Sequence, residues 1–208
     1  MVSMCEIYNE KIQDLLINPN KRPQHGLKIR ESKVKGIYVE GQSSHPVDSF
    51  EAIDKKMEEG NRNRTIGSTQ MNATSSRAHT VISIEFKQIT SYGGKKAEKL
   101  SVISLIDLAG SEKAEQTGAT GDRLKEGCAI NKSLTCLGNV ISALADKAMG
   151  KAKKGAVVPY RDSALTRMLQ NALGGNSKTI MICAISPASS NFEETLSTLR
   201  YADRAKKI

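Results

Sequence analysis

Apolar and polar positions alternate along much of the first hundred residues, which is typical of strands. Residues 1–16 predict a strand that runs into a short helical piece. Residues 27–31 and 36–40 predict two short strands around a polar turn. A helix is then expected from 47 to near Gly60, where the apolar spacing ends.

The middle of the chain is expected to combine a long loop with a hairpin. The stretch 61–78 is rich in Gly, Ser, Thr and Asn, and we expect a loop there. A loop of that length is usually either functional or disordered. Strands are expected at 81–86 and 100–106, joined by a turn at 92–96. The second strand is apolar enough to be buried on both faces of a sheet.

Helical spacing dominates the second half of the chain. Apolar residues recur every three or four positions on one face of a long helix: Ile130, Leu134, Leu137, Val140, Ile141 and Leu144. A second helix is expected at 161–173, a strand at 179–185 and a last helix at 192–207. The mixture of strands and helices predicts the α/β class.

Composition excludes several classes of protein. The chain has 208 residues, of which 38% are hydrophobic and 25% charged, so a packed core is expected rather than disorder. The longest uncharged stretch, 179–192, is interrupted by Pro187 and is too short to span a membrane. No signal peptide pattern opens the chain. No two cysteines have C-x-x-C spacing, so we expect reduced, mostly buried thiols in a cytosolic protein: Cys5, Cys128, Cys136 and Cys183.

The net charge of +9 points to an acidic partner. Nucleic acid is a poor candidate, because only 4% of the residues are aromatic and no nucleic-acid motif appears. Basic residues are concentrated between 147 and 167, a segment that contains six Lys or Arg residues and a single acid, Asp162. These six are Lys147, Lys151, Lys153, Lys154, Arg161 and Arg167. On charge alone, this segment is either a solvated loop or a surface for an acidic partner.

Two short motifs could carry chemistry together. Asp107 ends an apolar strand and is followed by x-x-Gly110, a pattern of phosphate-sensing switches in nucleotide hydrolases. The carboxylate can hold Mg²⁺, and a glycine lets a backbone N–H approach a phosphate. The second motif, 72–79, offers hydroxyl groups and Arg77 just before a strand. Each alone has an ordinary structural explanation, but together they form a two-switch layout in which Arg77 and Glu112 could pair.

We interpret the lone His79 as a hydrogen-bonded structural residue and not as a catalyst.

These residues, in this order, resemble the kinesin motor domain. The resemblance covers almost the whole chain and is carried by 6–16, 71–79, 107–112, 130–134, 137–141, 159–163, 165–167, 173–179 and 195–202. The segment 123–127 and the lysine-bearing loop resemble the transport class with N-terminal motors. The resemblance implies one partial kinesin motor domain over 1–208, with a partial P-loop NTPase fold in which helices flank a central, mostly β sheet. Switch I would lie at about 61–80 and switch II at about 105–130. The microtubule-facing region would lie at about 122–173.

The chain also departs from the family pattern. The phosphate-binding loop G-x-x-x-x-G-K-[ST] is absent, and 174–179 fails that pattern because Ser177 precedes Lys178. Ala78 stands where the family usually has Ser, and the neck linker is missing. The chain thus resembles the carboxyl two-thirds of a motor domain. We expect it to expose a sheet edge and not to hydrolyse ATP alone.

The resemblance assigns roles for ATP and Mg²⁺ in the complete domain. It implies Asn72 and Ser75 in nucleotide binding, with Ser75 also positioning the attacking water. It implies Ser76 at Mg²⁺, and Asp107 holding Mg²⁺ through water. Gly110 would sense the γ-phosphate, and Glu112 would pair with Arg77 and relay a proton from the attacking water. Asn131 would link switch II to the long helix.

The implied function is that of a microtubule-based motor of the cytoplasm and cytoskeleton, in which ATP hydrolysis is coupled to microtubule binding. This chain would carry the switch and track-binding part. The basic residues between 147 and 167 would face the acidic microtubule, with no nucleic-acid partner and no membrane contact from this segment. The alternative is a non-catalytic microtubule-binding fragment without ATPase activity. An upstream phosphate-binding loop in the complete gene would favour the motor.

Overall fold

A computed structural model describes residues 1–69, 77–93, 95–110 and 122–208, and at 65–69 and 122–130 it describes the backbone alone. The chain divides into two compact units. The first, here called the sheet unit, consists of Met1–Lys28 and Val39–Gly110. The second, the helix unit, consists of Ile29–Tyr38 and Ser111–Ile208. The α/β class is confirmed.

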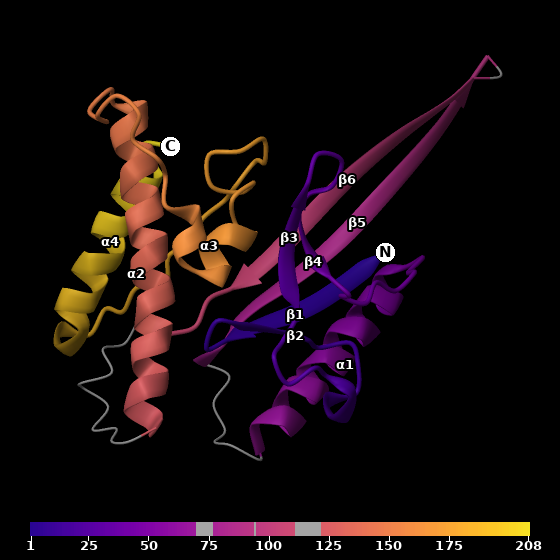
Figure 1. Cartoon of the computed structure of the whole chain (residues 1–208), viewed down its shortest axis with the longest axis horizontal. Helices are drawn as coiled ribbons and strands as arrows, with labels where there is room; N and C mark the ends of the chain where they lie inside the picture. The colour runs from indigo at the N-terminus through magenta and orange to yellow at the C-terminus, as the bar shows by residue number, and fades with distance from the viewer. Residues whose placement is uncertain (70–76, 94, 111–121) are drawn as a thin grey trace. The chain divides into compact units, whose positions relative to one another are not determined.

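The sheet unit is built on four antiparallel strands in the order β2-β1-β5-β6 (Figure 1). These strands are β1 (Val2–Tyr8), β2 (Lys11–Asp14), β5 (His79–Tyr92) and β6 (Lys95–Asp107). Strand β1 pairs with β5 only from Val2 opposite Ile84 to Ile7 opposite His79. The outer part of the β5–β6 hairpin therefore extends past β1 as a two-stranded ribbon.

The first hairpin corrects the expected helical piece within residues 1–16. Asn9 and Glu10 both have positive φ, 49° and 62°, and they join β1 directly to β2. Two successive residues with positive φ form the turn whose twist matches a two-residue hairpin, and Asn is a favoured residue there. Asn9 was the sequence signal for this hairpin turn. The helical spacing of Ile12, Leu15 and Leu16 led to the prediction of a helix instead.

Helix α1 (Phe50–Thr69) runs past Gly60 and corrects the expected boundary there. A Cβ on Gly60 would lie 2.2 Å from the sulfur of Met4, so the glycine permits a close approach of α1 to β1. The apolar cluster beneath the helix consists of Val2, Met4, Leu15 and Leu16, with Ile53 of α1 packed against it. The part of the predicted loop from 61 to 69 is therefore helical, because packing on the sheet outweighs its polar composition.

Strand β6 forms an edge of the described sheet, which agrees with the expected exposed edge. It also corrects the expectation that 100–106 is buried on both faces. Val102, Ile103 and Leu105 are 58%, 52% and 45% exposed. An apolar strand sequence predicts burial only if a neighbour covers it, and no further strand pairs with β6 among the described residues.

The predicted strands at 27–31 and 36–40 are confirmed as β3 (Lys28–Ser32) and β4 (Gly36–Glu40), which form a separate two-stranded sheet. In the helix unit, α2 (Asp122–Ala148) carries the predicted apolar face. Leu137, Val140 and Ile141 are buried along it. Helix α4 (Phe192–Ala205) confirms the last predicted helix, and it lies beside α2, with the Tyr201 ring near Gly138 (Figure 1).

Two elements of the helix unit differ from expectation. The predicted helix 161–173 is a 3-10 turn (Tyr160–Asp162) followed by the short helix α3 (Ala164–Met168). Ser163 separates them because its backbone is extended and its side chain caps α3 through the amide of Thr166. The predicted strand 179–185 is not formed, and Ile180 and Ile182 are 89% and 91% exposed. A strand needs a hydrogen-bonding neighbour, and no described segment provides one.

Three of the four cysteines have described side chains. Cys5 and Cys136 are buried, Cys183 is half-buried, and all three are free thiols, as expected. Burial raises the pKa of the Cys5 thiol to about 12, which makes that thiol unreactive. No helix in the described ranges combines the length and the apolar character that a bilayer crossing requires.

Candidate functional site

The described parts of the two candidate switch motifs, 77–79 and 107–110, lie at one end of the sheet unit. Thr80 of β5 lies opposite Asp107 of β6, and this is the last register pair of the hairpin. Because the strands are antiparallel, the residues before β5 and those after β6 leave the sheet at the same end. Arg77 and Gly110 each lie three residues beyond this pair. The antiparallel register therefore places Arg77 and Gly110, the outermost described residues of the two motifs, at the same end of the sheet.

His79 connects these two motifs through its side chain. Its Nδ1 accepts a hydrogen bond from the backbone N–H of Ala109 at 3.0 Å. The two residues are only 2% and 5% exposed. Burial lowers the pKa of His79 to about 4, and the nearby Asp107 carboxylate opposes that shift only in part. The imidazole is therefore neutral near pH 7, and the prediction that His79 is a hydrogen-bonded structural residue is confirmed.

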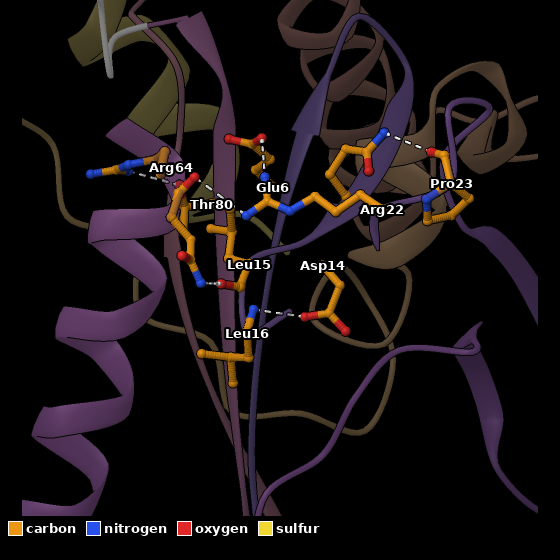
Figure 2. Close-up of polar contacts among 10 residues, drawn as sticks. Glu6, Asp14, Leu15, Leu16, Arg22, Pro23, Arg64 and Thr80 are labelled. Atoms are coloured by element: carbon orange, nitrogen blue, oxygen red, sulfur yellow. Dashed lines mark hydrogen bonds and ion pairs between the residues drawn. The ribbon is translucent and has the colours of Figure 1, made fainter. Parts of the chain in front are cut away.

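The last described side chains of α1 are tied to the same end of the sheet (Figure 2). The Arg64 guanidinium donates to the hydroxyl of Thr80 at 3.0 Å. The Asn63 amide donates to the carbonyl of Leu15 at 2.8 Å. Sequence reasoning missed both contacts because it placed these residues in a loop. The stretch 61–64, where the predicted switch I begins, therefore lies on a helix that Arg64 anchors to β5.

Further buried and half-buried polar side chains are tied to the same strands and to α1. The Arg22 guanidinium lies 3.8 Å from the Glu6 carboxylate, and it donates to the Asn63 carbonyl at 3.4 Å (Figure 2). Burial raises the pKa of Glu6 above its usual value, although Arg22 and Arg64 both oppose the shift. Asp14 is fully buried and accepts from the backbone N–H groups of Leu16 at 2.8 Å and Ser43 at 2.6 Å.

The structure describes part of the predicted nucleotide site. Arg77 and Gly110 are half-buried, and Asp107 is exposed at the end of β6. Asn131 is half-buried on α2. The remaining candidates, Asn72, Ser75, Ser76 and Glu112, lie outside the described residues, so the Arg77–Glu112 pair stays a prediction. Sequence reasoning missed His79 as a link because it placed the start of the strand at 81, whereas β5 begins at His79.

The described donor set fits Mg²⁺ only when a phosphate shares the ion. Within the described ranges, no group of three or more His, Cys, Asp or Glu side chains gathers as a metal site. Asp107 offers one exposed carboxylate. Mg²⁺ in nucleotide sites is usually held by one or two carboxylates together with substrate phosphates and water. One carboxylate beside a glycine turn is compatible with that arrangement.

The six candidate basic residues all belong to the helix unit. Lys147 is near the end of α2, and Lys151, Lys153 and Lys154 follow it in the connection to the 3-10 turn. All four are exposed, whereas Arg167 on α3 is half-buried. The Arg161 side chain is 81% exposed and lies 3.8 Å from Glu31 of β3. We call residues 147–167 the basic segment.

The loop between β3 and β4 adds further charge to the helix unit. Its exposed Lys33 and Lys35 belong to the same compact unit as the basic segment, although more than a hundred residues separate them in sequence. The Asn171 side chain lies near Gly36 of the same hairpin. Sequence reasoning missed this grouping because nothing local links the two segments.

The fold defines an α/β protein in which an Asp107-x-x-Gly110 motif follows an apolar strand of a sheet. The family model described as the kinesin motor domain matches residues 1–208. The chain therefore belongs to the kinesin motor domain family.

Relatives and solved structures agree with this membership. The chain is 59% identical over 209 residues to Kinesin-related protein 1 of Dictyostelium discoideum, covering 100% of this chain and 9% of that protein. It is 59% identical over 210 residues to Kinesin-like protein KIF13A of Mus musculus, covering 100% of this chain and 12% of that protein. The chain thus spans about a tenth of the length of these relatives.

A solved structure of a KIF14 dimer, bound to AMP-PNP and in complex with a microtubule, is similar to this chain. The TM-score is 0.87 at 47% sequence identity, and the match covers 100% of this chain and 57% of that one. The fold of the chain is therefore that of a kinesin motor domain over its whole length.

Proposed function

We propose that this chain supplies the nucleotide-switch and track-binding part of a microtubule-based motor that hydrolyses ATP. The observation that carries the proposal is the β5–β6 register, with Thr80 opposite Asp107, which brings the two switch motifs to one end of the sheet. In a kinesin-family chain, that is the arrangement a γ-phosphate sensor requires. The proposal also assigns the protein to the microtubule cytoskeleton of the cytoplasm.

The nucleotide roles follow the positions of the switch residues. Asp107 would hold Mg²⁺ through water, and the Gly110 N–H would meet the γ-phosphate. Arg77 would pair with Glu112 when the two segments close. Asn72, Ser75 and Ser76 would complete the site, with Ser76 at the metal and Ser75 at the attacking water. When bound, Mg²⁺ neutralises developing charge on the phosphates, and the protein contributes positioning.

The basic segment is the proposed contact with the microtubule. Its lysines are exposed and carry no counter-charge within the segment except Asp162. Flexible, exposed lysines attract an acidic surface over a distance set by ionic strength, about 10 Å at 0.1 M salt. They favour fast encounter over a single fixed geometry. Lys33 and Lys35 of the β3–β4 loop would add to the same attraction.

Co-sedimentation of the 208-residue chain with microtubules tests the track-binding part. Changing Lys151, Lys153 and Lys154 together to alanine should weaken binding about fivefold to tenfold at low salt, from the usual worth of exposed charges. The difference should shrink as salt is added. The matched control changes three exposed lysines of the sheet unit to alanine: Lys95, Lys96 and Lys99. Equal losses in the two variants, or no loss in either, would contradict the proposal.

The ATP-hydrolysis part of the proposal is tested on the full-length protein. These 208 residues contain no G-x-x-x-x-G-K-[ST] sequence, so we expect no Mg·ATP turnover from this chain alone. Full-length protein should hydrolyse Mg·ATP, and microtubules should stimulate the turnover. A full-length protein that binds microtubules but never hydrolyses ATP would support the non-catalytic alternative.

A further inference from the structure

His79 occupies the point where the β5–β6 pairing ends. Its backbone pairs with Ile7 of β1 on one side. On the other side, the register of β5 with β6 stops at Thr80 opposite Asp107. The next described hydrogen bond beyond that pair is the one from the Ala109 N–H to the His79 imidazole. The His79 side chain therefore links the two segments beyond the last strand pair, where backbone pairing between β5 and β6 has ended.

The chemistry of this contact is specific. The Ala109 amide is shielded from water, and a buried N–H without an acceptor is costly. Nδ1 can accept that proton only if the imidazole is neutral and its own proton is on Nε2. Burial keeps the ring in that neutral form near pH 7 by lowering its pKa to about 4. A buried apolar side chain of similar size would fill the space and leave the amide unsatisfied.

The contact joins the two segments that the proposed function uses. Arg77 lies two residues before His79, and Gly110 is the residue after Ala109. If the Ala109 amide were not bonded to His79, the segment after β6 could shift, and the Gly110 N–H would then move relative to Arg77. The imidazole supplies that hold from the first residue of β5, which is itself fixed by the sheet.

We infer that His79 is a positioning residue, which holds the Ala109 amide so that the Gly110 N–H keeps its position relative to Arg77. The inference rests on the proposed nucleotide function for its consequence, but the contact itself can be measured independently. His79 touches no reacting atom in this role. It acts through Ala109 on Gly110.

Hydrogen exchange in the 208-residue chain measures the contact. In His79→Leu, the Ala109 amide should exchange about tenfold faster or more, because its acceptor is lost. The reference is the Leu15 amide of the same unit, which donates to the Met4 carbonyl at 2.9 Å and should keep its rate. In His79→Asn, which retains an acceptor near the Nδ1 position, slow exchange of Ala109 should return. Equal acceleration of Ala109 and Leu15 would mean general destabilisation and would overturn the inference.

A measurement on the unmodified chain covers the case in which His79→Leu fails to fold. ¹⁵N NMR of the imidazole near pH 7 should show an unprotonated Nδ1 and a protonated Nε2. A protonated Nδ1 would overturn the inference without any variant.

In the full-length protein, His79→Leu should lower microtubule-stimulated ATP turnover at least tenfold while co-sedimentation with microtubules is kept, and His79→Asn should restore turnover. Unchanged turnover in His79→Leu would overturn the positioning role. An absence of turnover in the unmodified full-length protein would instead contradict the proposed function, and the exchange and NMR results would still decide the contact.

Discussion

The switch end of the sheet unit and the basic segment of the helix unit are built from opposite kinds of polar group. At the sheet, His79 and Asp14 are buried, and each accepts from defined backbone N–H groups at distances between 2.6 and 3.0 Å. In the basic segment, the lysines are exposed, and the Arg161–Glu31 contact is long and solvated. Buried groups require one partner in one geometry. Exposed charges act together and are screened by salt.

This difference implies that equivalent substitutions in the two regions have unequal consequences. A lost acceptor in the sheet unit leaves buried donors unsatisfied, so its cost appears as lost stability. A lost charge in the basic segment is replaced by water, so its cost appears only when an acidic partner is present.

The largest effect is expected at Asp14. Asp14→Ala removes the acceptor of the Leu16 and Ser43 amides and should lower the free energy of unfolding by about 2–5 kcal/mol. Arg161→Ala, which breaks an exposed pair, should change it by less than about 0.5 kcal/mol. Urea titrations of the 208-residue chain, followed by circular dichroism, give both values. Similar losses at the two sites would remove the contrast between the regions.

An intermediate effect is expected where α1 touches β1. Gly60→Ala introduces a Cβ 2.2 Å from the buried Met4 sulfur and should destabilise the sheet unit by about 1–3 kcal/mol through overpacking. Gly138→Ala is the matched control, because a Cβ there would lie 3.5 Å from the Tyr201 ring, an ordinary contact. In α2, the same change should stabilise by up to about 1 kcal/mol through helix propensity. Thermal or urea unfolding tests whether the two changes have opposite signs.

The Gly60 effect should also depend on Met4. In a Met4→Ala background, Gly60→Ala should lose most of its cost, because the clashing sulfur is gone. Additive losses in the double variant would show that the clash is not the cause.

The smallest effect is a pH dependence from His79. The pKa of His79 is about 4 in the folded chain and near 6.5 when exposed, so the unfolded chain binds the additional proton between these values. Stability from this group is complete above about pH 6.5 and is lost as the pH falls toward 4. Between pH 6.5 and 5.5 the loss should be about 1 kcal/mol. The matched control is His79→Asn, whose free energy of unfolding, measured by urea titration, should not fall in this way between pH 6.5 and 5.5. If the variant and the unmodified chain had the same pH dependence, the burial of a neutral ring at His79 would be contradicted.

Patterns along the sequence correctly predicted the elements that can be recognised from their own residues. The face of α2, with Leu137 and Val140, follows from apolar spacing along one helix. The two strands of the β5–β6 hairpin follow from their apolar runs, and the end of β6 at Asp107 follows from the acid that closes the second run. The family resemblance, carried by motifs in order, also lies wholly in the sequence, and the match of the kinesin motor domain model over residues 1–208 agrees with it.

Elements that depend on a neighbour could not be predicted in this way. The apolar sequence at 179–185 is strand-like, yet no described strand pairs with it. Helix α1 continues past Gly60 because of contacts with Met4 and Leu15 that are distant in sequence. The exposure of β6 likewise depends on which strand lies beside it, and that information is not in its own residues.

The amino-acid sequence alone established the kinesin-family resemblance, the α/β class and the basic segment, and it predicted the switch residues, because these depend on residue type and spacing. The tertiary structure was needed to show that Thr80 lies opposite Asp107, that His79 holds Ala109, and that the β3–β4 loop belongs with the basic segment. Those facts depend on strand register and packing between distant segments. Both are set by the free energy of the whole fold and not by any local pattern.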